Sequence, residues 1–338
     1  MKREQDKKEG GMLGGVVERF RGKKVCVIGD IIADVYIFGK PYRLSREAPV
    51  VIVKFEESRI FPGSAGNTIN NLLALGAYVC PLGFIGSDNA GKKLMKYFSQ
   101  HKNIDTGGII RHDGETVTKT RILAGDTHTS KQQVIRIDKD SNRPVSRSER
   151  STLMKKLKAT APSVDAFIVS DYGHGTIDEE IIDFMKNIAK RKIVVGDSRY
   201  GLEMFKGFTI ITPNESEAYR LSGFDDDQDI NRVGRTIMGK MRLKALLITR
   251  GNKGMRLFVG SRKIYDIPIS GTDDVADVTG AGDTVCATIA LSLAGGADFY
   301  TASRIANYAA GIVVMKRGTA TVTVQELEKA IGNQGELQ

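Results

Sequence analysis

The sequence has no tryptophan and only three cysteines and four histidines among its 338 residues. Cys26, Cys80 and Cys286 lie far apart in apolar stretches, so the pattern predicts neither a disulfide framework nor a cysteine-rich metal site. The histidines show no spacing typical of metal ligands. Buried thiols of this kind indicate a reducing compartment, and we expect the protein to be cytoplasmic.

Long hydrophobic runs are also absent, so we expect no membrane partner. Residues 12–17 are too few and too rich in glycine for the core of a signal peptide. Positive charge exceeds negative charge by 10, with 50 Lys and Arg against 40 Asp and Glu. This excess suits an anionic substrate. However, the basic residues are spread along the chain and form no recognisable nucleic-acid-binding module, so we expect no nucleic acid as a partner.

Short apolar runs alternate with helical patterns over about 200 residues. The predicted strands are residues 24–29, 78–85, 166–170, 193–196, 208–212 and 245–249. The predicted helices are residues 65–75, 92–100, 147–161, 178–191 and 215–222. This alternation predicts an α/β fold, a doubly wound parallel sheet with helices on both faces.

Two β-rich segments, about 35–60 and 113–138, contain no helix. We interpret them as strands of a small separate sheet inserted in the α/β core, which would form a lid over a site. The lid's strand edges would be unpaired in a monomer, so we expect a homodimer that forms through the lid. The remaining organisation is one domain over residues 22–338, preceded by a polar N-terminal tail at residues 1–21.

The strongest local signal is the segment DVTGAGD, which precedes a run of small apolar residues typical of a buried helix. Thr279 is the expected N-cap, and Gly280, Ala281 and Gly282 open the helix. Their unobstructed backbone N–H groups and the positive end of the helix dipole predict an anion site. Asp283 could accept a proton from a hydroxyl that attacks a phosphoryl group there. A glycine-rich helix start packed tightly on a strand is the alternative.

Four ordered motifs resemble the signatures of the ribokinase (PfkB) family of sugar kinases. They are PGSAGN at residues 62–67, GSDNAG at 86–91, NESE at 214–217 and DVTGAGD at 277–283. The resemblance covers residues 22–330 and implies a single ribokinase-like domain that transfers the γ-phosphoryl group of ATP to a sugar hydroxyl. It implies ATP and Mg²⁺ as cofactors and leaves open the need for a monovalent cation.

Other segments resemble, within this family, the kinases that phosphorylate D-glycero-β-D-manno-heptose 7-phosphate to the 1,7-bisphosphate. They are VIGDIIAD, YRLSREAPVVIV, KQQVIRID, SDYGHGT and TRGNKGM. In bifunctional relatives a nucleotidyltransferase domain follows the kinase, and we expect only the kinase half in this chain. A sugar phosphate and ATP are therefore the expected small-molecule partners.

The resemblance also assigns roles to single residues. Asp283 resembles the catalytic base, and residues 280–282 resemble the anion hole. Asn214 and Glu217 resemble the pair that binds magnesium through water, and their i, i+3 spacing puts both on one helical face. An ordinary polar helix start is the alternative. The residues expected at the nucleotide are Asn214, Thr249, Arg250, Gly251 and Gly254.

The expected substrate-binding residues fall into two groups. Asp34, Gly63 and Asn67 resemble contacts to the sugar, and Asp171 follows a buried strand end, where ligands of open α/β sheets collect. Arg43, Lys119 and Arg121 are candidates for a substrate phosphate, although solvated lid charges would look the same.

Several positions depart from the heptose-kinase pattern. Ser64 and Gly66 stand where Gly and Ala are usual, His174 stands in place of Lys, and Ser198 and Arg199 stand in place of Pro-Lys. The identity of the sugar therefore stays open: a hexose phosphate, a pentose or a nucleoside are the alternatives. A catalytically inactive sugar or nucleotide sensor on the same fold is a further alternative. The presence of Asp283 disfavours it, because a protein that only binds has no need of a base.

Overall fold

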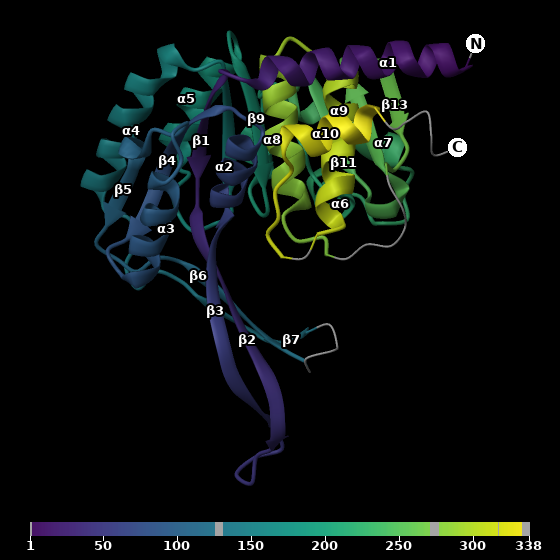
Figure 1. Cartoon of the computed structure of the whole chain (residues 1–338). Coiled ribbons are helices and arrows are strands. Elements are labelled where there is room, and N and C mark those ends of the chain that lie inside the picture. The colour runs from purple at the N-terminus through teal and green to yellow at the C-terminus, as the bar shows by residue number, and fades with distance from the viewer. Residues whose placement is uncertain (1, 126–130, 271–276, 317, 333–338) are drawn as a thin grey trace.

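The structure, a computed structural model, describes residues 2–125, 131–270, 277–316 and 318–332. A nine-stranded sheet forms its centre, in the order β13-β12-β11-β10-β9-β8-β1-β4-β5 (Figure 1). The strands are β1 (Lys24–Gly29), β4 (Tyr78–Gly86), β5 (Ile109–His112), β8 (Ala166–Asp171), β9 (Ile193–Ser198), β10 (Ile210–Ile211), β11 (Ala245–Thr249), β12 (Met255–Val259) and β13 (Lys263–Ile267). Neighbouring strands run parallel from β5 to β11, whereas β12 and β13 pair antiparallel.

Helices pack on both faces of this sheet, which confirms the predicted doubly wound α/β fold. One face carries α1 (Lys2–Val17), α2 (Ala65–Ala74), α3 (Asn89–Ser99), α8 (Ala281–Ala294), α9 (Phe299–Val314) and α10 (Val324–Gly332). The other face carries α4 (Arg147–Thr160), α5 (Glu179–Ala189), α6 (Glu215–Ser222) and α7 (Ile230–Met241). Short 3₁₀ turns lie at Glu18–Phe20, Thr106–Gly108, Ala161–Ser163, Leu202–Phe205 and Gly251–Lys253.

The interior strand β1 contributes to both hydrophobic cores. Val25 and Val27 pack into the core under α2 and α8, whereas Cys26 and Ile28 pack into the core under α4 and α5. This division follows from the two-residue period of a strand, whose successive side chains point to opposite faces. A continuous apolar run is what a strand buried on both faces requires.

A second, four-stranded sheet has the order β3-β2-β6-β7 and projects away from the core (Figure 1). Its strands are β2 (Ile31–Leu44), β3 (Val51–Ser64), β6 (Thr118–Ala124) and β7 (Gln132–Lys139). β2 runs parallel to β6, and the other two pairings are antiparallel. We call this sheet the lid. That it covers a site remains a prediction.

The N-terminal segment is not the polar tail that its charge predicted. Residues 2–17 form α1, which lies along the molecule beside α10 (Figure 1). Leu13, Val16, Val17 and Phe20 are buried in the core under α8 and α9. Their spacing of three, one and three residues places them on one side of a helix. The lysines and glycines around them hid this stripe in the sequence.

Two expectations from composition can be compared with the described residues. The three cysteines are free thiols, with Cys26 and Cys286 buried and Cys80 partly exposed. Among the described helices, none combines the length and the apolar character that crossing a bilayer requires.

Candidate active site

A cleft of about 620 Å³ opens at the carboxyl ends of β9, β10 and β11. Asp197, Thr212 and Thr249 line its sheet side, and the first turn of α8 lines its opposite side. Ligands of open α/β sheets bind at this edge, because loops from several strands meet there. The cleft is therefore the first place to look for a substrate.

Asp283 lies in the first turn of α8, beside this cleft, with only 5% of its surface exposed. Asn67 Nδ2 donates to its Oδ2 at 2.8 Å, and Tyr172 Oη donates to its Oδ1 at 2.9 Å. Thr68 Oγ1 lies 3.4 Å from the same Oδ1. Residues from α2 and from the loop after β8 thus converge on one carboxylate of α8.

Burial raises the pKa of Asp283 to about 6, because a charged carboxylate is poorly solvated there. The hydrogen bonds from Asn67, Tyr172 and Thr68 act in the opposite direction, and the negative charge of Asp34 raises the pKa further. A carboxylate with a pKa near 6 is ionised at neutral pH and is a much stronger base than an exposed aspartate. Asp283 is therefore suited to accept a proton.

The start of α8 differs in detail from the prediction. Gly280, with φ of 81°, is the N-cap, and Thr279 instead donates its backbone N–H to Asp277. A Cβ on Gly280 would lie 2.4 Å from Asn67 Nδ2, so only glycine fits. Ala281 donates its N–H to the Val278 carbonyl at 3.2 Å. Of the three predicted anion-hole amides, those of Gly280 and Gly282 thus have no backbone acceptor among the described residues.

The lid contributes a second carboxylate, that of Asp34 on β2. Arg121 on β6 pairs with Asp34 Oδ1. A Cβ on Gly63 would lie 2.4 Å from Asp34 Oδ2, so this glycine allows the carboxylate to pack against β3. Arg121 is thus already neutralised by a buried partner. Arg43 lies nine residues beyond Asp34 along β2, roughly 30 Å away, and is exposed at the far end of the lid. The structure does not bring Arg43 to the site.

Two predicted sugar contacts are occupied by protein groups. Asn67 uses its amide nitrogen on Asp283 and its Oδ1 accepts from Asn71. Asp171 accepts from Ser198 Oγ at 2.7 Å and from the Gly173 N–H at 3.0 Å. Asn67 lies in the site all the same. Asp171 instead holds the turn after β8, and direct contact of either residue with a sugar remains a prediction.

The predicted nucleotide residues lie around the cleft with one exception. Asn214, Thr249, Gly251 and Gly254 line it. A Cβ on Gly254 would lie 2.2 Å from the Ile267 carbonyl, so glycine is required there. Arg250 is not among the lining residues, because its guanidinium pairs with Glu215 at 3.0 Å.

Asn214 and Glu217 begin α6 as a capping box. Glu217 Oε2 accepts the Asn214 N–H and Asn214 Oδ1 accepts the Glu217 N–H, both at 2.9 Å. The two residues therefore do form an ordinary polar helix start, which was the alternative to a magnesium site. This capping leaves Glu217 Oε1 without a partner in the described structure. Burial raises the pKa of Glu217.

The side of the cleft that carries Asp197 and Glu217 suits a hydrated divalent cation. Asp197 has no cationic partner within the described residues, and its pKa is well above the usual range because of burial and the charges of Asp283 and Glu217. No group of three potential ligands close enough to hold a metal directly occurs among the described residues. Mg²⁺ is commonly bound by one or two carboxylates, waters and substrate phosphates, so these residues fit it.

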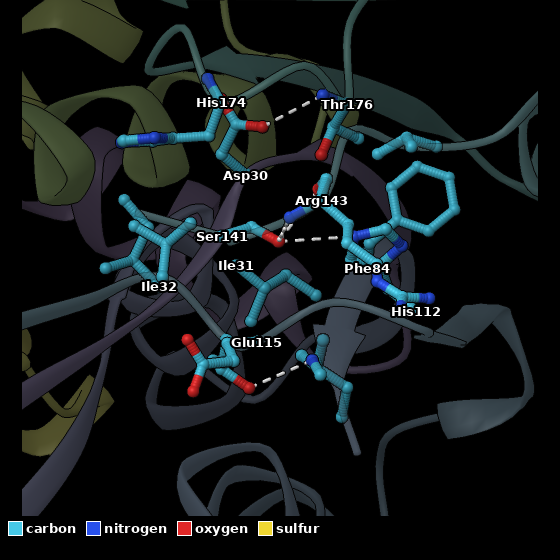
Figure 2. Close-up of a pocket in the computed structure, with 15 residues that line it drawn as sticks. Asp30, Ile31, Ile32, Phe84, His112, Glu115, Ser141, Arg143, His174 and Thr176 are labelled. Atoms are coloured by element: carbon cyan, nitrogen blue, oxygen red, sulfur yellow. Dashed lines mark hydrogen bonds between the residues drawn. The ribbon is translucent and has the colours of Figure 1, made fainter. Parts of the chain in front are cut away.

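Sequence reasoning missed Asp30, Thr68 and Tyr172. Asp30, which is buried, accepts the N–H groups of Tyr172, His174 and Thr176 at 2.8 to 3.1 Å. Figure 2 shows it beside His174 and Thr176, at a small cavity behind the site. Asp30 thereby fixes the loop that carries Tyr172 to Asp283. The only available signals were an aspartate directly after β1 and the glycines of the loop after β8.

The pattern of the pfkB family carbohydrate kinases matches residues 22–326. The chain belongs to this family of carbohydrate kinases. The enzyme class expected from the sequence is thus confirmed. The kinase is 37% identical to the bifunctional protein HldE of Trichlorobacter lovleyi over 326 residues and 37% identical to that of Geobacter sulfurreducens over 314 residues. These alignments cover 95% and 91% of this chain but 65% and 63% of the relatives, so the chain spans less than two thirds of their length.

Solved structures show the same fold at low sequence identity. The ribokinase of Arabidopsis thaliana, solved with ribose and ATP, has a TM-score of 0.69 and 19% identity, and covers 94% of the kinase and 100% of its own chain. Phosphofructokinase-2 of Escherichia coli, solved with substrates and products, has a TM-score of 0.75 and 13% identity, and covers 91% and 98%.

Proposed function

We propose that the kinase transfers the γ-phosphoryl group of ATP to the anomeric hydroxyl of D-glycero-β-D-manno-heptose 7-phosphate, giving the 1,7-bisphosphate. The observation that carries the reaction type is Asp283, a buried carboxylate with a pKa near 6 at the start of α8. The heptose is supported by the segments that resemble heptose kinases and by the 37% identity to the HldE proteins.

The sugar would lie between the lid and the start of α8, with its acceptor hydroxyl at Asp283. Asn67 and Tyr172 orient the carboxylate, which takes the hydroxyl proton as the oxygen attacks the γ-phosphorus. The free amides of Gly280 and Gly282 would stabilise the charge on the transferred group. Exclusion of water by the lid would prevent hydrolysis of ATP.

ATP would occupy the cleft beside β10 and β11, with its phosphates directed to α8. Asn214, Thr249 and Gly251 would contact the nucleotide. Glu217 and Asn214 would hold Mg²⁺ through water, with Asp197 close by, and the ion would neutralise charge on the phosphate oxygens. Whether the reaction requires a monovalent cation is tested by comparing turnover in potassium salts with turnover in tetramethylammonium salts.

We also propose a homodimer that forms through the lid. β3 and β7 are the edge strands of the lid, and no described helix covers its outer part (Figure 1). Large apolar side chains are 48 to 67% exposed there: Tyr42, Leu44, Val50, Val51, Phe55, Val134, Ile135 and Ile137. A second copy presents the same surface, so a twofold axis would pair apolar area with apolar area.

The test is release of ADP from Mg-ATP with heptose 7-phosphate, hexose phosphates, pentoses and nucleosides as acceptors. Turnover on heptose 7-phosphate that Asp283→Asn lowers by a factor of about 10² to 10⁴, with substrate binding retained, is the expected result. Turnover on another sugar alone would keep the mechanism and discard the heptose. ATP binding without turnover on any acceptor would favour the sensor alternative.

A further inference from the structure

Charged side chains line a second cavity, of about 570 Å³, between the lid and the loops that follow β8 and β9. Five lining residues are basic and two are acidic. Tyr172 lines this cavity and also the cleft beside α8, and its hydroxyl donates to Asp283. The basic cavity and the proposed catalytic base are therefore separated by a single side chain.

Three of the five basic side chains already hold a carboxylate at 2.6 to 3.0 Å: Arg136 with Asp138, Arg143 with Asp113, and Arg150 with Asp178. The other acidic lining residue, Asp140, lies 3.3 Å from the His174 ring. Lys119 and Arg199 have no carboxylate within ion-pair distance in the part of the chain that the structure describes. They are the unbalanced charges of the cavity.

The register of the lid explains why Lys119 has no partner. Lys119 on β6 lies opposite Asp34 on β2 and opposite Asp138 on β7. Residues that lie opposite each other on paired strands project from the same face. Asp34 is taken by Arg121, and Asp138 is taken by Arg136. Three cations thus share two carboxylates on this face, and Lys119 is the cation left over.

Lys119 occupies a position where burial disfavours its positive charge. It is partly buried, with Nζ 5.3 Å from the centre of the Tyr172 ring. Burial lowers the pKa of Lys119, and the charges of Arg199 and Arg136 lower it further, whereas the charges of Asp34 and Asp138 act in the opposite direction. Two cations that repel each other across a partly buried cavity would be stabilised by an anion bound between them.

We propose that this cavity binds a phosphate group that the sugar substrate already carries, held between Lys119 and Arg199. The inference rests on the proposed function and deepens it. A phosphate monoester carries between one and a half and two negative charges at neutral pH, which two cations balance. The Tyr172 ring faces Lys119 and its hydroxyl faces Asp283. The phosphate would therefore lie at the end of the sugar remote from the reacting hydroxyl.

This assignment replaces two of the three phosphate ligands suggested by the sequence. Arg43 lies far out on the lid, and Arg121 is neutralised by Asp34. Lys119 remains, and Arg199 joins it from the core. Arg199 also lines the cleft, and its charge lowers the pKa of Glu217 there. A phosphate of ATP is therefore the other source from which the anion could come.

Steady-state kinetics with heptose 7-phosphate and with the unphosphorylated heptose distinguish these sources. In Lys119→Gln and in Arg199→Gln we expect KM for the sugar phosphate to rise at least tenfold, and the preference for the phosphorylated sugar to fall by a similar factor. Lys139→Gln is the matched control, because Lys139 is a lid lysine that already pairs with Glu115 at 2.6 Å. A rise confined to KM for ATP, or an equal loss on both sugars, overturns the inference.

A binding measurement separates this inference from the proposed function. Inorganic phosphate is titrated into the protein saturated with Mg²⁺ and a non-hydrolysable ATP analogue, so that the nucleotide cleft is filled. Binding to the wild type that is lost in the Lys119→Gln/Arg199→Gln double variant supports the anion site, even if none of the sugars is phosphorylated and the proposed function fails. Undetectable binding to the wild type, or unchanged binding to the double variant, overturns it.

Discussion

At the scale of the residue, the environment of Asp283 sets its proton affinity. Its pKa is about 6 in the folded protein, compared with an ordinary value near 4. A base is active only when it is ionised, so kcat/KM should fall tenfold per pH unit below about pH 6 and level off above it. The measurement is the pH profile of kcat/KM at saturating Mg-ATP. A profile that is flat down to pH 4.5 would contradict Asp283 as the base.

Tyr172→Phe tests the same environment. The hydroxyl of Tyr172 stabilises the ionised carboxylate, so its removal should raise the pKa of Asp283 and move the acid limb to higher pH. Tyr97→Phe is the matched control, since its hydroxyl bonds to Asn70, away from the site. An acid limb that does not move would show that the tyrosine is not a partner of the base.

The same pKa shift has a consequence for stability. The folded state binds the proton of Asp283 more tightly than the unfolded state does, so its ionisation reduces the free energy of unfolding as pH rises from about 4 to 6. Above pH 6 this loss is complete. The burial that creates a useful base therefore destabilises the fold at the pH where the base is active.

Local sequence predicted Asp283 and the glycines before it, since a glycine-rich helix start has its own pattern. It could not predict Tyr172, which reaches Asp283 across 111 residues of chain, or Asp30, which holds the Tyr172 loop from another strand. Their roles arise from the packing of separate strands. Arg121 shows a different limit, because a charge indicates a phosphate only where no protein carboxylate neutralises it, and Arg43 was misplaced because the sequence does not show how far the lid strands extend from the core.

At the scale of the element, α1 is part of the core. Phe20, which follows α1, is fully buried against the packing of α8. We expect Phe20→Ala to lower the free energy of unfolding by about 3–5 kcal/mol, because it removes a buried aromatic ring and leaves a cavity. Denaturant unfolding measures this change. Met12→Ala, at a position 52% exposed, is the control and should have an effect below about 0.5 kcal/mol.

Equal effects of the two substitutions would mean that α1 does not dock. The sequence obscured this helix because seven charged residues and four glycines dilute the apolar stripe near its end. The parallel strands were predictable by comparison, since each is an uninterrupted apolar run. β10 is the exception: only Ile210–Ile211 pair, fewer than the five residues predicted.

At the scale of the whole molecule, the two sheets differ in how much of their apolar surface is exposed. The central sheet is covered by helices on both faces, whereas the outer lid presents apolar side chains and two free edges. A lid of this kind on an isolated monomer would promote aggregation. Pairing with a second lid would cover this apolar surface.

The proposed dimer is therefore the hypothesis about the whole molecule that most needs a test. We expect the wild type to sediment as a dimer and Ile137→Glu to sediment as a monomer, since a buried unpaired carboxylate disfavours the interface. Ile137 and Met12 are each 52% exposed, so Met12→Glu, on α1, is a matched control that should remain dimeric. A monomeric wild type at assay concentrations would refute the lid interface. If the lid needs its partner to hold its shape, Ile137→Glu should also raise KM for the sugar and leave KM for ATP unchanged, because the nucleotide cleft lies in the core.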